Sequence, residues 1–348
     1  MNILDILDAD DFEQLTLVRD PDSGIRSAVA IHDTTMGPSL GGVRMRAYPS
    51  FDDAVRDAMA LARAMTYKSA LAGLSLGGGK SVVDAAPTPA NKAAFLPVHA
   101  RHVASLGGRY IPGADMGTDA SDMEILAKDV PVVSSRRDPS PFTARGVFRA
   151  IGATLGRAGH DGLAGRRVAV QGLGKVGASL VGLLRAAGAE VLVTDVDDAR
   201  VRAVRDAAGA VAVPVGEILT ADVDVLCPCA AGGVLTATVV DRLRAGAIVP
   251  GANNPLAAPE LASTLAARGV DYVPDFVANA GGVIVCEAEV LGSDDGIDDK
   301  IDAIGTTAVR ILDAAAERGT DTVTVAHELA RARLTAQAAA RPAFPALA

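Results

Sequence analysis

Residues 168–195 read VAVQGLGKVGASLVGLLRAAGAEVLVTD, and this stretch decides the fold of the second half of the chain. An apolar run ends at Gln171, a glycine-rich turn follows, and a helical pattern of small and apolar residues continues to Ala187. A second apolar run then leads into Asp195. The order of strand, glycine-rich turn, helix, strand and acid is typical of a dinucleotide-binding βαβ unit.

Each glycine of the GxGxxG turn has a physical reason. Gly172 allows a tight turn, Gly174 lets the backbone approach a pyrophosphate, and Gly177 lets the helix pack closely on the strand. Lys175 and Val176 complete the turn, and the helix N-terminus that starts here offers unpaired N–H groups to an anion. A lone GxGxxG is weak evidence, but here both strands, the helix and the acid accompany it.

The residues around Asp195 bear on the choice of cofactor. Asp195 follows the turn at the spacing, about 20 residues, at which a carboxylate meets the ribose 2′-hydroxyl of a dinucleotide. Asp197 and Asp198 add negative charge, and no basic residue follows before Arg200. Because a 2′-phosphate would be repelled there, the stretch favours NAD over NADP.

The composition limits the class of protein. The 348 residues are 49% hydrophobic and 22% charged, which favours two domains with sizeable cores. The net charge of −9 leaves no basic footprint for nucleic acid. The acidic start resembles no secretory signal, and no apolar run reaches the length of a membrane span. We therefore expect a cytoplasmic protein without nucleic-acid or membrane partners.

Neither the cysteines nor the histidines predict a metal site. Cys227, Cys229 and Cys286 are too few and wrongly spaced for a disulfide framework or a zinc site. The five histidines show no HExxH pattern. We expect buried cysteines that act as small hydrophobic residues, and no metal.

The first half of the chain begins with a predicted antiparallel hairpin. Two alternating segments, residues 14–20 and 24–33, flank the turn sequence Asp-Pro-Asp-Ser-Gly. An open strand near the start also allows pairing between subunits, so a homo-oligomer is expected. A helical pattern follows over residues 51–65.

Two lysines and one aspartate in this half are candidates for chemistry. Lys68 and Lys80 lie in a markedly apolar, glycine-rich region, where desolvation disfavours the ammonium form. The glycines before Lys80 are not a phosphate loop, because Leu74 stands where GxxxxGK requires glycine. Asp115 follows a short predicted strand between glycines, where it is either a catalytic carboxylate or an N-cap or turn residue.

The paired glycines Gly41 and Gly42 have two interpretations as well. They form a bulge beside a strand, which the spacing alone favours, or they let backbone N–H groups approach a carboxylate.

The α/β alternation continues after Asp195. Strands are predicted at residues 223–226, 247–249 and 272–274, each followed by a loop. Loops at the carboxyl ends of parallel strands hold the ligand in open α/β sheets, so five loop residues are candidates for the cofactor site, although a loop asparagine is more often a turn former. They are Cys229, Ala230, Asn253, Asn254 and Asn279. The last two helical segments, about 301–318 and 324–340, are amphipathic, and we expect the last to return to the N-terminal domain.

Seven segments together resemble the amino-acid dehydrogenase family, that of the leucine, valine and phenylalanine dehydrogenases, related to glutamate dehydrogenase. The segments occur in the family's order and span most of residues 30–290, which makes the likeness far more specific than any single motif. They are GPSLGGVRM, MTYKSALAGLSLGGGK, GGRYIPGADMGT, SPFTARGV, VQGLGKVG, PGANNPLAAPEL and DFVANAGGV.

The resemblance implies a role for each matching residue. Lys68 would bind the substrate carboxylate with the backbone at Gly41 and Gly42, Lys80 would be the general base, and Asp115 would relay protons. Thr143 would lie near the nicotinamide amide, with the matched asparagines near the cofactor. The side-chain pocket would be lined by Leu40, Gly113, Val283 and Cys286.

Two departures from the family pattern matter: one keeps a non-catalytic protein as an alternative, and the other bears on the substrate. Residues 133–140 are shorter than their counterpart and lack its glycine-rich loop. Glu287 stands where relatives have a small or apolar residue, and a polar substrate side chain would be accepted if Glu287 faced the pocket. Small Gly113 leaves room for a larger side chain, while Leu40 and Val283 keep the pocket apolar. The sequence therefore does not distinguish leucine or valine from an aromatic amino acid as the substrate.

These observations predict an α/β protein of two domains with a cleft between them. Residues 1–141, with a C-terminal helix at about 324–348, would form the substrate and oligomerisation domain, and residues 142–323 a doubly wound Rossmann-type NAD domain. The expected activity is reversible, NAD-dependent oxidative deamination of an apolar L-amino acid to the 2-oxo acid and ammonia. The alternatives are a dehydrogenase of another small substrate and a non-catalytic NAD-binding regulatory protein.

Overall fold

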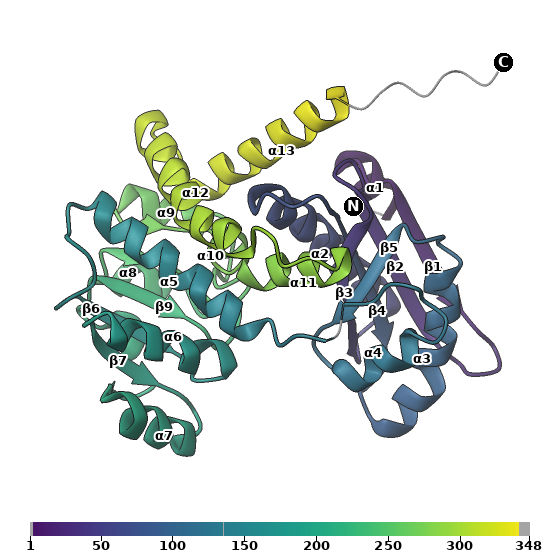
Figure 1. Ribbon diagram of the computed structural model, residues 1–348, viewed down its shortest axis with the longest axis horizontal. Coiled ribbons are helices and arrows are strands. Elements are labelled where there is room, and N and C mark those ends of the chain that lie inside the picture. The colour runs from purple at the N-terminus through teal and green to yellow at the C-terminus, as the bar shows by residue number, and fades with distance from the viewer. Residues whose placement is uncertain (1–2, 135, 341–348) are drawn as a thin grey trace. The chain divides into compact units, whose positions relative to one another are not determined.

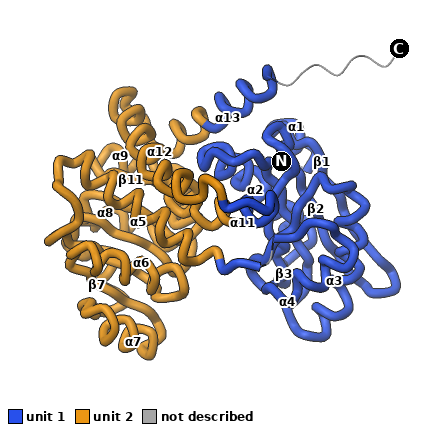
Figure 2. The backbone as a smooth tube through the Cα atoms, viewed as in Figure 1, with its two compact units in different colours: residues 1–138, 286–294, 330–348 blue, residues 139–285, 295–329 orange. Residues whose placement is uncertain are grey.

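The computed structural model describes residues 3–134 and 136–340, and these residues divide into two compact units (Figure 2). Unit 1 contains the described residues up to Asp138, the segment Cys286–Asp294 and the residues from Ala330 onward. Unit 2 contains Pro139–Val285 and Asp295–Leu329. Residues 341–348, part of the predicted C-terminal segment, lie outside the described residues.

Unit 1 is built on a mixed sheet of five strands in the order β1-β2-β4-β3-β5 (Figure 1). The strands β1 and β2 form the predicted antiparallel hairpin, with Gln14 opposite Ile31, and β4 pairs antiparallel to β2. Strand β3 runs parallel to both of its neighbours, β4 and β5. The bounds are β1 Gln14–Arg19, β2 Arg26–Asp33, β3 Ser39–Arg46, β4 Gly77–Asp84 and β5 Tyr110–Ala114.

Helices cover both faces of this sheet. Helix α2 packs its apolar stripe on β2 and β4, where Ala30 and Val82 are buried beneath Ala58 and Met59. Helices α3 and α4 contribute Leu96 and Met123 to a second cluster, which includes Val43 and Val83 of the opposite face. The bounds are α1 Ile3–Ala9, α2 Phe51–Leu71, α3 Pro89–Ala104 and α4 Ala120–Leu126.

Helix α2 is longer than its predicted range, residues 51–65. It begins at the N-cap Ser50, whose side chain accepts the Asp53 N–H, and it continues to Leu71. Thr66, Ser69 and Ala70 are buried and keep the helical period, and the helix ends before Gly73, which has a φ of 76°. Lys68 therefore lies on the last turn of a helix.

Unit 2 has a parallel sheet of six strands in the order β11-β10-β9-β6-β7-β8. The chain enters at β6 in the middle, fills one side with β7 and β8, and then fills the other with β9 to β11. This is the doubly wound, Rossmann-type arrangement, whose switch point lies between β6 and β9. The bounds are β6 Arg167–Gln171, β7 Glu190–Thr194, β8 Val211–Ala212, β9 Val225–Pro228, β10 Ala247–Ile248 and β11 Asp271–Tyr272.

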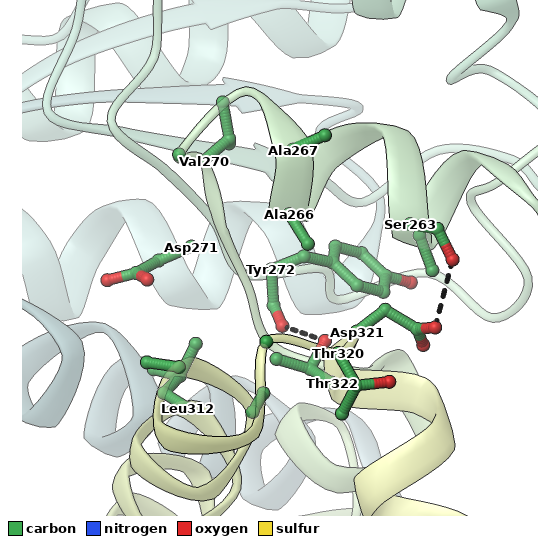
Figure 3. A pocket seen from close by; sticks show the side chains of 15 residues that line it. Ser263, Ala266, Ala267, Val270, Asp271, Tyr272, Leu312, Thr320, Asp321 and Thr322 are labelled. Carbon is green, nitrogen blue, oxygen red and sulfur yellow. Dashed lines mark hydrogen bonds between the residues drawn. The ribbon is translucent and has the colours of Figure 1, made fainter.

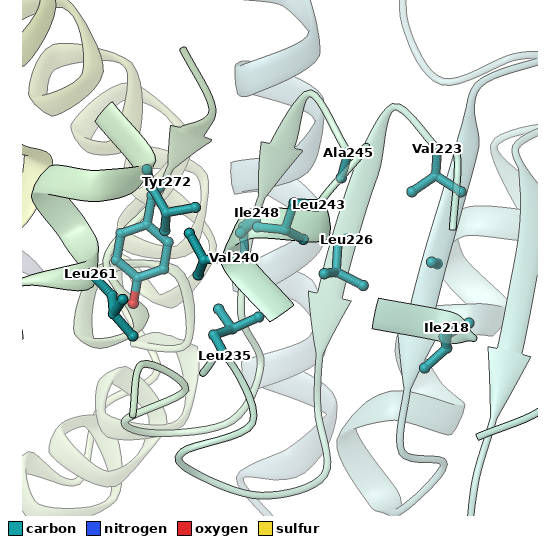
Figure 4. Close-up of a cluster of buried hydrophobic side chains, with 12 residues drawn as sticks. Ile218, Val223, Leu226, Leu235, Val240, Leu243, Ala245, Ile248, Leu261 and Tyr272 are labelled. Carbon is teal, nitrogen blue, oxygen red and sulfur yellow. The ribbon is translucent and has the colours of Figure 1, made fainter. Parts of the chain in front are cut away.

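The core of unit 2 fills the space beside this sheet (Figure 4). Leu226, Ile248 and Tyr272 from three neighbouring strands pack with Leu235 and Leu261 from the connecting segments. The helices, which complete the unit, are α5 Ser140–Arg157, α6 Lys175–Ala186, α7 Asp198–Ala208, η1 Ile218–Thr220, α8 Ala237–Arg242, α9 Leu261–Ala267, α10 Asp275–Ala278 and α12 Ile297–Arg318. Two further helices contribute residues to both units, α11 Gly281–Leu291 and α13 Thr322–Ala340.

One strand was predicted two residues too early. Strand β9 covers Val225–Pro228 rather than residues 223–226, with Val170 opposite Cys227 and Gln171 opposite Pro228. Cys227 is fully buried and behaves as a small core residue. The loop that follows β9 therefore starts at Cys229.

Candidate active site

The site in unit 1 is organised around Lys80, Gly42 and Asp115. Because β3 lies between β4 and β5, Lys80 on β4 reaches Asp115, just past β5, across Gly42 on β3. The Lys80 Nζ lies 2.6 Å from Asp115 Oδ2. A Cβ at Gly42 would lie 2.6 Å from the Asp115 Cβ and 3.2 Å from the Lys80 Nζ. The ion pair occupies the space that a side chain at position 42 would need.

The neighbouring glycines bring the backbone strands close together. A Cβ at Gly41 would lie 1.8 Å from the Gly79 carbonyl oxygen, and one at Gly78 would lie 2.1 Å from the Thr66 nitrogen. Gly41 and Gly42 belong to the regular part of β3, where Gly42 stands opposite Gly113 of β5. Both glycines are therefore required for close packing.

The pair has shifted titration behaviour. Complete burial lowers the pKa of the Lys80 ammonium below its usual range; the Asp115 carboxylate opposes this and Arg44 adds to it. Burial alone would raise the pKa of Asp115, but Lys80 and Arg44 lower it to about 2. A lysine with reduced proton affinity beside a carboxylate that is ionised in the ligand-free site is suited to general-base chemistry near neutral pH.

Sequence reasoning missed Arg44 and Asp57. The Arg44 Nε donates to Asp115 Oδ2 and its Nη1 donates to Asp57 Oδ2, both at 3.0 Å. The signal was present, since Arg44 follows Gly42 at the two-residue period of a strand and shares its face.

Lys68 lies on the same unit and is only 9% exposed. It projects from the last turn of α2, the helix that packs on β4 and on the face of the sheet that carries Lys80.

An apolar cluster in unit 1 includes two of the predicted pocket residues. Leu40 and Cys286 pack with Leu76, Ile111 and Val290. The predicted pocket residue Val283 belongs to unit 2.

Ser134 is a second residue that sequence reasoning missed. It forms a bridge with Gly113, its N–H donates to the Pro112 carbonyl oxygen at 2.9 Å, and it is 5% exposed. Its hydroxyl also hydrogen-bonds to the Cys286 thiol. Burial raises the pKa of this thiol, and the hydrogen bond offsets part of that increase. A Cβ at Gly113 would only make ordinary contacts with Ser134, at 3.4 Å and beyond.

The Glu287 carboxylate binds the chain itself. Glu287 is 1% exposed, and its Oε1 accepts the Ser75 N–H at 2.5 Å in the turn between α2 and β4. Arg333 of α13 binds the same turn, donating to the carbonyl oxygens of Ala70 and Leu74.

In unit 2 the glycine-rich turn has the tight geometry expected at Gly172 and the close helix packing expected at Gly177. Gly172 has a φ of 93°, and a Cβ there would lie 2.6 Å from the Ala230 Cβ. A Cβ at Gly177 would lie 1.9 Å from the Gly172 carbonyl oxygen, so α6 packs tightly on the turn. Gly174, the N-cap of α6, has open space around it. Lys175 and Val176 form the first turn of α6.

Asp195 lies just past β7 and faces this turn. Its Oδ2 accepts the Leu173 N–H at 2.6 Å and its Oδ1 accepts the Asp197 N–H at 2.9 Å. Partial burial acts to raise its pKa, but backbone hydrogen bonds, chiefly these two, and the Arg200 guanidinium together lower it. Arg200 lies 3.8 Å from Asp195 and 3.4 Å from Asp197, so one guanidinium faces two carboxylates.

The predicted residues at the other strand ends of unit 2 lie near one another. The Asn279 Nδ2 donates to Asn253 Oδ1 at 2.8 Å and to the Gly251 carbonyl oxygen, while the Asn254 N–H donates to Asp275. A Cβ at Gly251 would lie 2.7 Å from the Cys229 Sγ. Thr143, at the start of α5, lies against Gly282, where a Cβ would be 2.7 Å from its Oγ1.

Two buried acceptors at these strand ends fit a bound dinucleotide. Asn279 Oδ1 and Gln171 Oε1 have no hydrogen-bond partner within the described part of the chain. Buried polar atoms are normally paired, so both are suited to accept hydrogen bonds from a ligand. Together with the open space above Gly174, they show that the residues present fit a nicotinamide dinucleotide.

Other features of the described residues do not suggest a different site. A pocket of about 460 Å³ in unit 2 lies beside α9, β11 and the turn between α12 and α13, and no predicted site residue lines it (Figure 3). Its polar groups bind one another, as in the Ser263 bond to Asp321 and the Thr322 bond to the Tyr272 carbonyl oxygen. Across residues 3–134 and 136–340 no acidic, histidine and cysteine side chains gather as a metal site, and no helix has the length and apolarity to cross a membrane.

Comparison with known proteins identifies the family. Residues 13–131 match the Glu/Leu/Phe/Val dehydrogenase dimerisation domain, and residues 194–341 match the Glutamate/Leucine/Phenylalanine/Valine dehydrogenase domain. These matches, with the Rossmann-type fold of unit 2, identify a nicotinamide-dependent dehydrogenase. The chain belongs to the Glu/Leu/Phe/Val dehydrogenase family and is an amino-acid dehydrogenase.

Individual relatives cover nearly the whole chain. Leucine dehydrogenase of Bacillus cereus is 36% identical, over 96% of this chain and 94% of the relative. Valine dehydrogenase of Streptomyces coelicolor is 39% identical, over 95% and 94%. The crystal structure of L-tryptophan dehydrogenase from Nostoc punctiforme superposes with a TM-score of 0.87 at 35% identity, covering 96% of this chain and 99% of that one.

Proposed function

We propose that this protein catalyses the reversible, NAD-dependent oxidative deamination of an L-amino acid with an apolar side chain. The observation that carries the proposal is the buried Lys80–Asp115 pair on a glycine-lined strand, in a chain whose second unit has a dinucleotide-binding turn. The family resemblance supplies the roles proposed for the residues.

The proposed mechanism begins with binding of the amino acid in unit 1. Lys68 holds the substrate carboxylate by a charge-assisted hydrogen bond, with backbone N–H groups at Gly41 and Gly42 nearby. The nicotinamide, when bound, supplies an acceptor for the hydride that leaves the substrate Cα. Neutral Lys80 takes a proton from the water that attacks the resulting iminium carbon, and general-base assistance of this kind contributes about 10²–10⁴-fold. Asp115 accepts a proton from the substrate ammonium before the hydride leaves and returns it to the amino group after water has added. The C–N bond then breaks, ammonia leaves, and loss of the hydroxyl proton gives the 2-oxo acid. Asp115 also stabilises the Lys80 ammonium.

The cofactor would be held by unit 2. The N–H groups at the start of α6 would bind the pyrophosphate beside Gly174, and Asp195 would bind the ribose hydroxyls. Cys229, Ala230 and the asparagines 253, 254 and 279 would border the nicotinamide half, together with Thr143. NAD is favoured over NADP because Arg200 faces two carboxylates, which leaves net negative charge where a 2′-phosphate would bind.

The substrate side chain is proposed to lie against Leu40, Gly113, Val283 and Cys286. Three arguments favour an apolar side chain: the buried apolar cluster around Leu40, the bond of Glu287 to Ser75, and relatives named for leucine, valine and tryptophan. Small Gly113 leaves room for either a branched aliphatic or an aromatic group.

The same family points to a homo-oligomer formed through unit 1. Strand β1 is an edge strand of its sheet among the described residues and carries exposed Leu17, and residues 13–131 match a dimerisation domain. The cytoplasmic location inferred from the sequence stays a prediction.

The test is NADH oxidation with a panel of aliphatic, aromatic and acidic 2-oxo acids, with and without ammonium. Turnover that requires ammonium, with an apolar acid as the best substrate, is the expected result. Turnover without ammonium would indicate a dehydrogenase of another class of substrate. NADH binding without turnover of any acid would favour a non-catalytic role.

A further inference from the structure

Arg44 is held between two carboxylates. It lies on β3, two residues after Gly42 and on the same face, and its side chain is 15% exposed. Its Nε donates to Asp115 Oδ2 and its Nη1 donates to Asp57 Oδ2, each at 3.0 Å. The guanidinium therefore spans from the end of β5 to helix α2.

A tyrosine holds Asp57, the second carboxylate that Arg44 contacts. Tyr48 donates its hydroxyl proton to Asp57 Oδ2 at 2.5 Å, the oxygen that also accepts from Arg44. Burial, reinforced by this hydrogen bond to Asp57, raises the pKa of Tyr48, so the hydroxyl remains a donor throughout the physiological range. Asp57 is thus fixed by two donors, and Arg44 has a defined position.

Arg44 and Lys80 bind the same atom. Asp115 Oδ2 lies 2.6 Å from the Lys80 Nζ and accepts the Arg44 Nε–H at 3.0 Å. A carboxylate oxygen shared between two cations neutralises each of them less than it would neutralise one alone. A second cation this close also disfavours the ammonium form of Lys80 directly.

We propose that Arg44, anchored by Asp57, is a positioning residue that orients Asp115 and limits how strongly this carboxylate retains the proton on Lys80. This inference rests on the proposed function of Lys80 as the general base. It assigns Arg44 the task of keeping Lys80 neutral enough to accept a proton while Asp115 stays beside it.

The charges that act on Lys80 come from β3, from the residue after β5 and from α2. Arg44 on β3 disfavours the ammonium form, whereas Asp115 after β5 and Asp57 on α2 favour it. Strand β2 places uncharged Ala30 opposite Lys80. Helix α2 also carries the second buried lysine of this unit, Lys68.

The proposal predicts shifts of opposite sign for two substitutions. The acidic limb of the kcat/KM profile for deamination reports loss of the Lys80 proton in the free enzyme. Arg44→Met removes a cation, and Asp115 then pairs with Lys80 alone. The ammonium form of Lys80 becomes more stable, so the limb should move to higher pH by about 1 unit. Asp57→Asn removes a carboxylate that favours the ammonium, so the limb should move to lower pH. General damage to the fold would not move the limb in opposite directions for substitutions of two residues that bind each other.

Two further variants complete the set. Arg44→Lys keeps the charge, so its limb should lie much closer to the wild-type pH than the limb of Arg44→Met. Arg63→Met is the matched control, because Arg63 is an arginine of the same unit that pairs with Asp10. Its limb should stay at the wild-type pH.

A direct titration separates this proposal from the proposed function. Selective ¹³C labelling of lysine gives few signals, because the sequence has only Lys68, Lys80, Lys92, Lys128, Lys175 and Lys300. The signal missing from Lys80→Ala identifies Lys80, and its titration by NMR needs no turnover. Should the wild type lack ammonium-dependent activity, the proposed function fails while this titration still tests Arg44.

The expected result is a higher Lys80 titration midpoint in Arg44→Met, a lower one in Asp57→Asn, and no change in Arg63→Met. If Arg44→Met does not fold, Arg44→Gln takes its place, because it also removes the cation and should raise the midpoint, while Asp57→Asn should lower it. A Lys80 midpoint and a pH limb that are the same in wild type, in every folded Arg44 variant and in Asp57→Asn would overturn the proposal.

Discussion

Position 42 shows how the size of one residue sets the placement of its neighbours. Lys80 and Asp115 meet over Gly42, and the space that separates them from the strand has no room for a methyl group. The backbone of β3 is regular here, so the requirement for glycine comes from close approach rather than from an unusual φ.

Gly42→Ala is therefore expected to separate the ion pair. The added Cβ would lie 2.6 Å from the Asp115 Cβ, which forces a shift of the carboxylate. A misplacement of this kind costs about 10²-fold in kcat. The measurement is steady-state kcat, with Gly156→Ala on α5, where a Cβ meets nothing within 4 Å, as the matched control. Activity of Gly42→Ala within a few-fold of wild type would exclude this role for the ion pair.

The candidate residues differ in how far the sequence could predict them. The family resemblance predicts both Lys80 and Asp115, and the apolar, glycine-rich surroundings point to Lys80 independently. Arg44, Asp57 and Ser134 were missed because their partners are distant in sequence, and local periodicity carries no information on such contacts.

Among the elements, the turn between α2 and β4 connects the two lysines. Lys68 lies on the last turn of α2, and Lys80 lies in β4 just beyond the turn. Glu287 of α11 and Arg333 of α13 bind the backbone of this turn. Two helices late in the sequence thereby fix the connection between early elements.

Glu287→Ala should destabilise unit 1. The substitution removes the carboxylate that accepts the Ser75 N–H, and because Ser75 itself is exposed and water can replace the acceptor, we expect a loss of about 1 kcal/mol. Glu287→Gln keeps an acceptor oxygen and should lose less. The measurement is the urea midpoint of unfolding. Equal midpoints for wild type and Glu287→Ala would show that the bond to Ser75 contributes nothing to stability.

The βαβ element of unit 2 contains Asp195, the residue predicted to favour NAD over NADP. Asp195→Ala should weaken binding of NADH more than binding of NADPH, because the carboxylate binds ribose hydroxyls and repels a 2′-phosphate. Fluorescence titration of both nucleotides measures this. Asp206→Ala is the control, since Asp206 is exposed and pairs with Arg205. Equal losses for the two nucleotides would remove Asp195 from the ribose contact.

Most elements of both sheets follow from sequence patterns, and the errors have local causes. The helix predicted for residues 51–65 stops short of the true end of α2 at Leu71. A lysine and glycines follow Met65 in the sequence, but the buried face of the helix continues through Ala70. Strand β9 was placed two residues early because Cys227 and Pro228 resemble a loop sequence, although Cys227 pairs with Val170 in the core.

At the scale of the molecule, the division into units does not follow the order of the chain. Unit 1 takes Cys286–Asp294 and the residues from Ala330 onward, whereas the sequence suggested a return by the last helix alone. Cys286 joins an apolar cluster with Leu40 and Ile111, contacts that helical periodicity does not reveal. Residues proposed for one side-chain pocket thus come from segments far apart in sequence.

The account as a whole depends on Lys80 as the base of an ammonium-dependent dehydrogenase. The most direct test is the kcat of Lys80→Ala for reductive amination of the best 2-oxo acid, measured together with its NADH dissociation constant. We predict a loss of about 10²-fold or more, the range of general-base catalysis, with NADH binding close to wild type. A kcat within a few-fold of wild type would contradict the central claim.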